Sequence, residues 1–538
     1  MRLRQLLTTI LLAFLTASLL QGCQIQTPPE NGPSEQDEQP VSEEPPSTDA
    51  SNSAPPMPGT FTLRYDPSTT MNPIMTLSKD NIVLSSLLYE SLFILDGNLK
   101  AEPLLCDNWS TEDNVTFTFA VRPGIAMSDG SLLDADDVAY SLRQAMFKGR
   151  YVNRLKSVSK IESDGDMTVT VVLYVANSRL INLLDIPIIK SGSIDSDSPP
   201  GTGPFFFAGP DEMRLDLFLG HRDSSRMPLR RIMLRECADN ELTELFDDGD
   251  LSLLWDDPSD AFEIRLNRLH AQKYYETSTM QFIGFNSRKG IMKDSDVRRA
   301  VGYSVDRQYI SENIMPQGQT LPSPTPLSPV FRPYDKAWEH PELDPQIEMT
   351  LLLMRAQLDD FDEDSFLELS DGADGYTKFS VDFIVNIENA HRVQAAHKIS
   401  DTLRRIGFNI AVRELTWEKF VTALQTGDFD MYFGEIALGA DFDLSPLLLP
   451  GGLGYGGTAS SFYRPFIEDF LAAESDNDVH YAAGRLCEEV FLNAPFVPIL
   501  YKRYAIYSPM GAITGAAPSQ SGVFHKLSNW VIDLTMLT

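Results

Sequence analysis

The sequence is poor in cysteine and in positive charge. Of 538 residues, four are Cys and 44 are Lys or Arg, whereas 76 are Asp or Glu, so the formal net charge is −32. Because such a chain repels phosphates, nucleic acid is not an expected partner. The acidity serves solubility and is compatible with amine-bearing ligands. Hydrophobic residues still make up 43% of the chain, enough for large cores, and the length predicts three to four domain-sized units.

The few cysteines and histidines show no pattern of a metal or catalytic site. Apart from Cys23, the cysteines are Cys106, Cys237 and Cys487, and none belongs to a Cys-x-x-Cys pair. The seven histidines are scattered and form no His-Glu-x-x-His motif. No nucleophile and base are recognisable by spacing. We therefore expect no enzyme, no cofactor and no metal site.

Long apolar runs are also scarce, and the one at the start sets the expected compartment. Arg2 and Arg4 precede an apolar run over residues 6–20, which is too short to span a membrane and typical of a signal peptide over 1–22. It ends in Leu20-Gln21-Gly22-Cys23, which resembles a bacterial lipobox. The motif predicts a lipid on Cys23 and a protein anchored to the outer, extracellular or periplasmic, face of the cell membrane. The alternative is a secretory signal with an incidental cysteine.

Residues 23–58 have the composition of a solvated linker. Pro, Ser, Glu, Gln and Thr dominate this stretch, which contains no Lys or Arg. A segment with so few large apolar residues cannot form a core. We therefore expect a lipid-anchored linker over 23–58 and a folded body from residue 59 onward.

The body alternates strand and helix patterns. Residues 115–122 and 410–415 are rich in β-branched or aromatic residues, which is typical of strands. Residues 134–148 begin with acids that suit a helix N-terminus. Apolar residues at helical spacing, from Val393 to Ile406, predict another helix. This alternation predicts an α/β fold in which helices cover sheets.

An ordered series of segments resembles the extracellular solute-binding proteins of family 5, the peptide- and nickel-type receptors of ABC importers. The resemblance covers roughly residues 60–505, and no single motif in it is decisive. The segments that carry it are Asn72-Pro73, 88–92, 115–125, 136–142, Gly201-Thr202-Gly203-Pro204-Phe205, 283–286, 297–301, 427–430 and 494–499.

The resemblance implies a two-lobed, periplasmic-binding-protein-like (Venus flytrap) fold with an extra inserted subdomain in the first lobe. Lobe I is expected over 59–275, with the insert at about 104–190, lobe II over 280–500, and a return to lobe I over 501–538. Such a monomer would capture short peptides in the inter-lobe cleft and deliver them to an ABC permease. The alternatives are a peptide-sensing receptor without transport and a nickel-type receptor for a metal or metal chelate.

The resemblance also indicates ligand-binding residues. The segment from Gly439 to Pro446 resembles one whose first Asp, in peptide-binding members, pairs with the peptide's α-ammonium. In this chain that residue is Asp441. A carboxylate in a poorly hydrated cleft gains a charge-assisted bond from an ammonium. The alternative is an ordinary loop Asp. The other candidates are Asp443, the backbone of Gly439 and Ala440 for strand-like hydrogen bonds, and Leu77 and Ser78 on lobe I.

One acidic segment partly resembles a calcium loop. It runs from Asp360 to Asp364 and continues to Glu368 and Asp371. Ser365 stands at the sixth position, where a calcium loop requires Gly. We therefore expect a solvated acidic loop and no metal.

Overall fold

The computed structural model describes residues 59–259, 264–316, 318–339, 349, 352–353, 355–370, 375–378 and 380–537. These residues belong to one compact unit, Pro58–Thr538. The predicted signal peptide, Cys23, the 23–58 linker and Asp371 lie outside the described residues. Where helices are described, none combines the length and the apolar character needed to cross a membrane.

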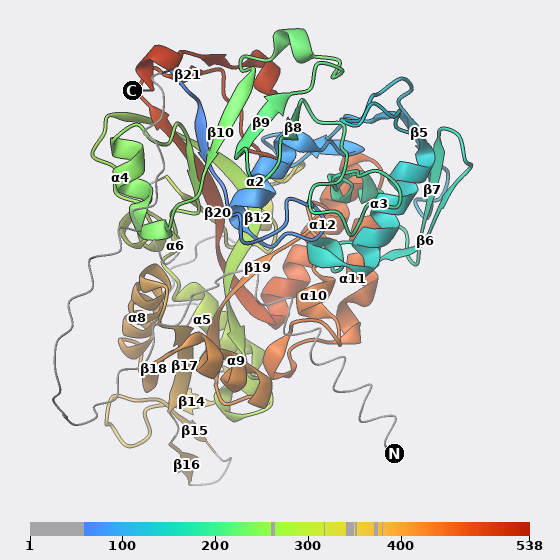
Figure 1. Cartoon of the computed structure of the whole chain (residues 1–538). Coiled ribbons are helices and arrows are strands. Elements are labelled where there is room, and N and C mark those ends of the chain that lie inside the picture. Colours follow the sequence, from blue (N-terminus) through green and yellow to red (C-terminus); the bar gives the residue numbers. More distant parts are fainter. Residues whose placement is uncertain are drawn as a thin grey trace, which may run out of the picture. The chain divides into compact units, whose positions relative to one another are not determined.

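A long pair of strands runs through the centre of this unit. β12 (His270–Phe285) and β20 (Phe496–Pro509) pair antiparallel over most of their length, with register shifts between Glu276 and Met280 and between Gln281 and Phe282. At about 3.3 Å per residue, β12 spans roughly 50 Å. Figure 1 shows both strands extending from the half that contains α2 to the half that contains α5 and α8. The two strands therefore connect both halves of the fold.

The same sheet contains five shorter described strands. Its order is β11-β20-β12-β19-β17-β18, and β13 pairs with β20. β17 pairs in parallel with β18 and β19. The other pairings are antiparallel: β20 pairs with β11, β12 and β13, and β12 also pairs with β19. The bounds are β11 (Leu254–Asp256), β13 (Thr320–Pro322), β17 (Val381–Asn386), β18 (Ile410–Leu415) and β19 (Met431–Ala437).

Two further sheets form in the first half of the chain. One has the order β1-β10-β9-β8 and the other, fully antiparallel, the order β4-β5-β7-β6. Alternate residues of β5 are buried, as its β-branched and aromatic pattern predicts. The bounds are β1 (Thr62–Arg64), β4 (Cys106–Thr111), β5 (Thr116–Val121), β6 (Val158–Ser163), β7 (Thr168–Leu173), β8 (Phe205–Phe207), β9 (Arg214–Leu217) and β10 (Arg231–Arg235).

Helices begin where capping side chains allow. Ser78 accepts a hydrogen bond from the N–H of Asn81 and begins α2 (Lys79–Leu88). Asp134 and Asp137 form a capping box that begins α3 (Ala135–Phe147), so the helix expected at 134–148 is confirmed. The other described helices of four residues or more with α geometry are α4 (Leu242–Asp247), α5 (Ser295–Tyr303), α8 (Ala390–Arg404), α9 (Trp417–Thr426), α10 (Ser445–Leu448), α11 (Arg464–Ala472) and α12 (Asp476–Asn493).

Short elements complete the described structure. The three-residue α6 (Arg307–Tyr309) leads directly into a π-helical turn, Ile310–Ile314. The short strands pair as β2-β3, β14-β15-β16 and β21-β22. Their bounds are β2 (Phe93–Leu95), β3 (Ala101–Pro103), β14 (Leu358–Asp359), β15 (Glu368–Ser370), β16 (Tyr376–Thr377), β21 (Ile513–Thr514) and β22 (Val531–Ile532).

The hydrophobic core is divided along the chain. One large cluster contains buried residues from 61–253 and takes in Ile506, Phe524 and Trp530 from the C-terminal segment. Two other hydrophobic clusters include residues of the long sheet. One contains Phe282 and Tyr432, and the other contains residues that are next to these two in sequence. Neighbouring strand residues point to opposite faces, so the sheet is buried on both sides. The lobe boundaries predicted at 275, 280 and 500 stay predictions.

Candidate functional site

Asp441 is buried against a segment that lies far away in the sequence. It follows β19 by four residues, and 3% of its surface is exposed. Its Oδ2 accepts a hydrogen bond from Nδ2 of Asn177 at 2.8 Å. Its Oδ1 accepts one from the backbone N–H of Asp443 at 3.3 Å. The carboxylate is therefore shielded from water, as recognition of an ammonium requires. In this arrangement the chain itself provides a hydrogen-bond donor to each carboxylate oxygen.

Arg179 brings a positive charge to the same place. Its Nε donates to the carbonyl of Asp441 at 3.3 Å, and its Nη2 donates to the carbonyl of Phe470 at 2.8 Å. The guanidinium carbon also lies 4.1 Å from the centroid of the Phe470 ring. Because Phe470 lies in the last turn of α11, the cation also interacts favourably with the negative end of that helix.

The charges at this site do not balance. Burial, followed by the neighbouring charge of Asp443, raises the pKa of Asp441 to about 6. Burial also raises the pKa of Asp443. Burial lowers the pKa of Arg179 to about 10, against the opposing effect of the two carboxylates. Among the described residues, the buried carboxylate of Asp441 and the half-buried carboxylate of Asp443 face one guanidinium, so one negative charge is left uncompensated when both acids are ionised and one further cation would stabilise the site.

The residues beside Asp441 have mainly structural contacts. Oδ1 of Asp443 accepts from the N–H of Ser445 at 2.8 Å, next to the start of α10. The carbonyl of Ala440 accepts from Nδ2 of Asn182 at 3.2 Å. A Cβ on Gly439 would lie 2.4 Å from Oδ1 of Asp441, so a larger residue there would displace the carboxylate. All three residues thus help to position Asp441 in this arrangement.

Leu77 and Ser78 lie elsewhere. Leu77 is 60% exposed, and Ser78 begins α2 as its N-cap. In the described contacts neither residue reaches Asp441 or segment 439–443. The structure therefore gives Ser78 a capping role and leaves the ligand role of both residues a prediction.

A contact surface that the sequence did not indicate surrounds Asp441. Residues 177–182, which we call the 177–182 segment, bond to the C-terminal end of α11 as well as to 440–441. The N–H of Ser178 donates to the carbonyl of Leu471 at 2.8 Å, and its Oγ donates to that of Ala473 at 2.6 Å. Short polar loop residues of this kind are common and carry no motif. Only the fold shows that they converge on Asp441.

A second charged cluster lies on the long sheet. Lys502 is 1% exposed, pairs with Asp257, and lies 3.1 Å from Oε2 of Glu435. Arg392 also pairs with Glu435 at 2.7 Å. Although burial opposes ionisation, these cations lower the pKa of Glu435 to about 2. The cluster joins β19, β20, α8 and the turn after β11.

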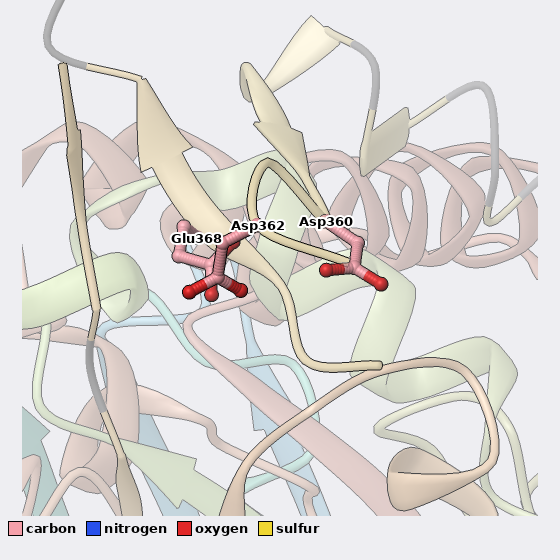
Figure 2. A group of neighbouring side chains, drawn as sticks. All are labelled: Asp360, Asp362 and Glu368. Atoms are coloured by element: carbon pink, nitrogen blue, oxygen red, sulfur yellow. The ribbon is translucent and has the colours of Figure 1, made fainter. Parts of the chain in front are cut away.

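Figure 2 shows the acidic loop, where Asp360, Asp362 and Glu368 lie close together. Lys378 pairs with Asp362 and Asp364, and these contacts raise the pKa of Lys378. Glu368 is buried, because it lies in β15 and its Oε2 accepts from the N–H of Phe361 at 2.9 Å. The expectation of a fully solvated loop is therefore wrong at Glu368. Within the described residues, a lysine already provides positive charge to this loop.

Comparison with known proteins decides the family. The profile of the bacterial extracellular solute-binding proteins, family 5 middle, matches residues 100–454. The chain belongs to this family. The family and the fold are those of substrate-binding proteins, not of enzymes.

Curated relatives of this family 5 chain match over part of their length. The glutathione-binding protein GsiB of Escherichia coli (strain K12) is 24% identical over 257 residues, which are 44% of this chain and 50% of that protein. GsiB of Salmonella typhimurium is 24% identical over 260 residues, 45% of this chain and 51% of that protein. The chain spans about half the length of the curated relatives it matches.

Solved structures match the fold over most of the chain. The oligopeptide-binding protein AppA of Bacillus subtilis, in complex with a nonapeptide, has a TM-score of 0.64 and 18% identity, covering 89% of this chain and 100% of that one. CtaP of Listeria monocytogenes, an ABC transporter substrate-binding protein, has a TM-score of 0.71 and 16% identity, covering 88% and 98%. The predicted fold, the mixed α/β fold of two-lobed solute-binding proteins, is confirmed.

Proposed function

We propose that this family 5 protein captures short peptides with a free α-ammonium group and delivers them to an ABC import permease. The observation that carries the proposal is the buried carboxylate of Asp441, which has a raised pKa and an uncompensated negative charge beside it. A buried carboxylate in such surroundings favours a cationic partner over a neutral one.

Binding at Asp441 requires the two contacting segments to separate. In the structure, the amide of Asn177 occupies Oδ2 of Asp441. An ammonium makes a stronger, charge-assisted bond to a carboxylate than a neutral amide does. A peptide that enters between 177–182 and 439–443 would therefore replace Asn177. β12 and β20 are the candidates for the strands that cross the hinge, and ligand contacts would shift the population toward the closed form.

The cellular setting is part of the same proposal. The lipobox-like sequence at Cys23 and the 23–58 linker support a monomeric lipoprotein that is tethered to the outer face of the cell membrane. The closed surfaces of the two lobes would then be recognised by the permease.

Calorimetry with a library of di- to hexapeptides tests this function on the purified protein. We expect saturable binding of free-amine peptides, and we expect mass spectrometry to find peptides in the purified material. Binding of a nickel–histidine complex with no response to any peptide would contradict the proposal and favour the metal-chelate alternative. Peptide uptake that is unchanged in a strain lacking the protein would contradict the delivery role and favour the sensing alternative.

A further inference from the structure

One donor of the Arg179 guanidinium has no described partner. Nε donates to the carbonyl of Asp441, and Nη2 donates to the carbonyl of Phe470. Nη1 is buried, and no described residue provides it with a hydrogen-bond acceptor. A buried donor without an acceptor costs free energy, so an acceptor supplied by a ligand would stabilise this guanidinium.

The surroundings of the guanidinium are aromatic. Its carbon lies 4.1 Å from the ring centroid of Phe470 and 6.0 Å from that of Phe331. The Phe331 ring packs against Phe442, with centroids 5.3 Å apart, and all three phenylalanines are buried. The face of an aromatic ring is only a weak acceptor, so these rings do not replace the missing partner of Nη1.

The charges beside Arg179 decide which kind of acceptor fits. The carboxylates of Asp441 and Asp443 both interact electrostatically with this guanidinium. One ligand ammonium would balance the charges of these three side chains. A ligand carboxylate on Nη1 would add a third negative charge, and like charges in a poorly hydrated site repel one another. A neutral carbonyl oxygen can accept from Nη1 without this repulsion.

We propose that Nη1 of Arg179 donates to the first carbonyl oxygen of a bound peptide, and that the site selects ligands with an ammonium and a neutral carbonyl on the same carbon. This selection rests on the proposed function, in which the ammonium lies on Asp441. Ordinary α-linked peptides have such a carbon at their N-terminus. A free amino acid, or a peptide linked through the γ-carboxyl of glutamate, has a carboxylate on that carbon and is selected against.

Two isomeric tripeptides test this selection by calorimetry on the purified protein. Glu-Ala-Gly and γ-Glu-Ala-Gly have the same composition and the same total charge. They differ in whether the carbon that bears the ammonium carries an amide carbonyl or a carboxylate. We expect Glu-Ala-Gly to bind at least tenfold more tightly, a difference of about 1.4 kcal/mol. Equal affinities, or tighter binding of γ-Glu-Ala-Gly, would overturn the proposal.

The α-carboxamide of γ-Glu-Ala-Gly shows whether the carboxylate itself is responsible. This compound keeps the γ-linked skeleton and replaces the α-carboxylate by a group with a neutral carbonyl. We expect it to bind at least tenfold more tightly than γ-Glu-Ala-Gly. If it binds no more tightly, the skeleton and not the charge causes the difference, and the proposal is wrong.

Asp443→Asn tests the role of charge in the selection. The variant removes one of the two negative charges that oppose a ligand carboxylate, so the preference for Glu-Ala-Gly over γ-Glu-Ala-Gly is expected to fall at least threefold. Asp248→Asn, at an exposed position at the end of α4, is the matched control and should keep the preference. An identical preference in Asp443→Asn and wild type would contradict the role of charge.

Arg179→Lys tests the contact with the carbonyl oxygen. Lysine keeps the positive charge and lacks the planar fork of donors. We expect Ala-Ala-Gly to bind about tenfold more weakly, whereas the preference that depends on charge remains. Unchanged affinity in a variant that is folded by circular dichroism would show that Arg179 does not contact the ligand. If the variant does not fold, the two isomers and Asp443→Asn still decide.

Failure of this selection is distinguishable from failure of the proposed function. Saturable binding of Ala-Ala-Gly together with equal affinities for the two glutamate isomers would leave peptide capture intact and overturn the selection alone. Absence of binding by Ala-Ala-Gly and by every other free-amine peptide would overturn both.

Discussion

Replacing Arg179 by methionine is expected to lower the free energy of unfolding by about 3 kcal/mol, because the variant loses two hydrogen bonds from a charged group and each such bond contributes about 1.5–3 kcal/mol. The variant loses the bonds from Arg179 to the carbonyls of Asp441 and Phe470. It also leaves the carboxylates of Asp441 and Asp443 without their neighbouring cation. Urea denaturation followed by circular dichroism measures the loss.

Arg464→Met is the matched control for Arg179→Met. Arg464 lies at the other end of α11, is 53% exposed, and pairs with Glu468 four residues along the helix. An exposed pair of this kind contributes about 0.3–0.5 kcal/mol. Equal losses in the two variants would show that Arg179 is an ordinary surface arginine and not the cation of the Asp441 site.

Acidic pH is expected to weaken the binding of amine-bearing peptides. The pKa of Asp441 is raised to about 6, and an α-ammonium binds the ionised carboxylate. The peptide ammonium, with a pKa of about 7.7–8.0, stays protonated below pH 7. Affinity should therefore fall by up to tenfold per pH unit below about pH 6. Calorimetry between pH 4.5 and pH 7 measures this slope, and a flat profile would contradict the assignment of Asp441.

The same raised pKa predicts how stability depends on pH. For an acid whose pKa is higher in the folded state, the stabilisation is fully present below the unfolded pKa of 3.8 and is lost as pH rises through about 6. The loss amounts to about 3 kcal/mol at 1.36 kcal/mol per pKa unit. Burial also raises the pKa of Asp80 to about 6, so both residues contribute to the pH dependence of the free energy of unfolding of the wild-type protein. The difference between wild type and Asp441→Asn isolates Asp441.

Local patterns predicted the local structure well. The strand expected at 410–415 is β18, and the apolar spacing from Val393 corresponds to α8, where Ile399 and Leu403 are buried. Such predictions depend on residues within a few positions of one another, and periodicity reports those directly. The family segments extended the prediction to the fold, because their order along the chain reflects the order of the elements.

Contacts between distant segments could not be predicted. Asn177 and Asp441 are 264 positions apart, and no local pattern indicates that an asparagine in a loop will bond to a buried carboxylate. Lys502 likewise lies beside Arg503 in a mostly buried strand, and its partner Asp257 is 245 positions away. Burial of these charges follows from the tertiary fold, which alone brings their partners together.

The central claim is that the carboxylate of Asp441 binds the α-ammonium of a peptide. The most direct test compares a free-amine peptide with its N-acetylated form in wild type, Asp441→Asn and Asp443→Asn by calorimetry. We expect Asp441→Asn to weaken the free-amine peptide about 100-fold, a loss within the 2–5 kcal/mol typical of a buried charge pair, and to leave the acetylated form unchanged. Equal losses for both peptides in Asp441→Asn, or a selective loss in Asp443→Asn alone, would contradict the claim.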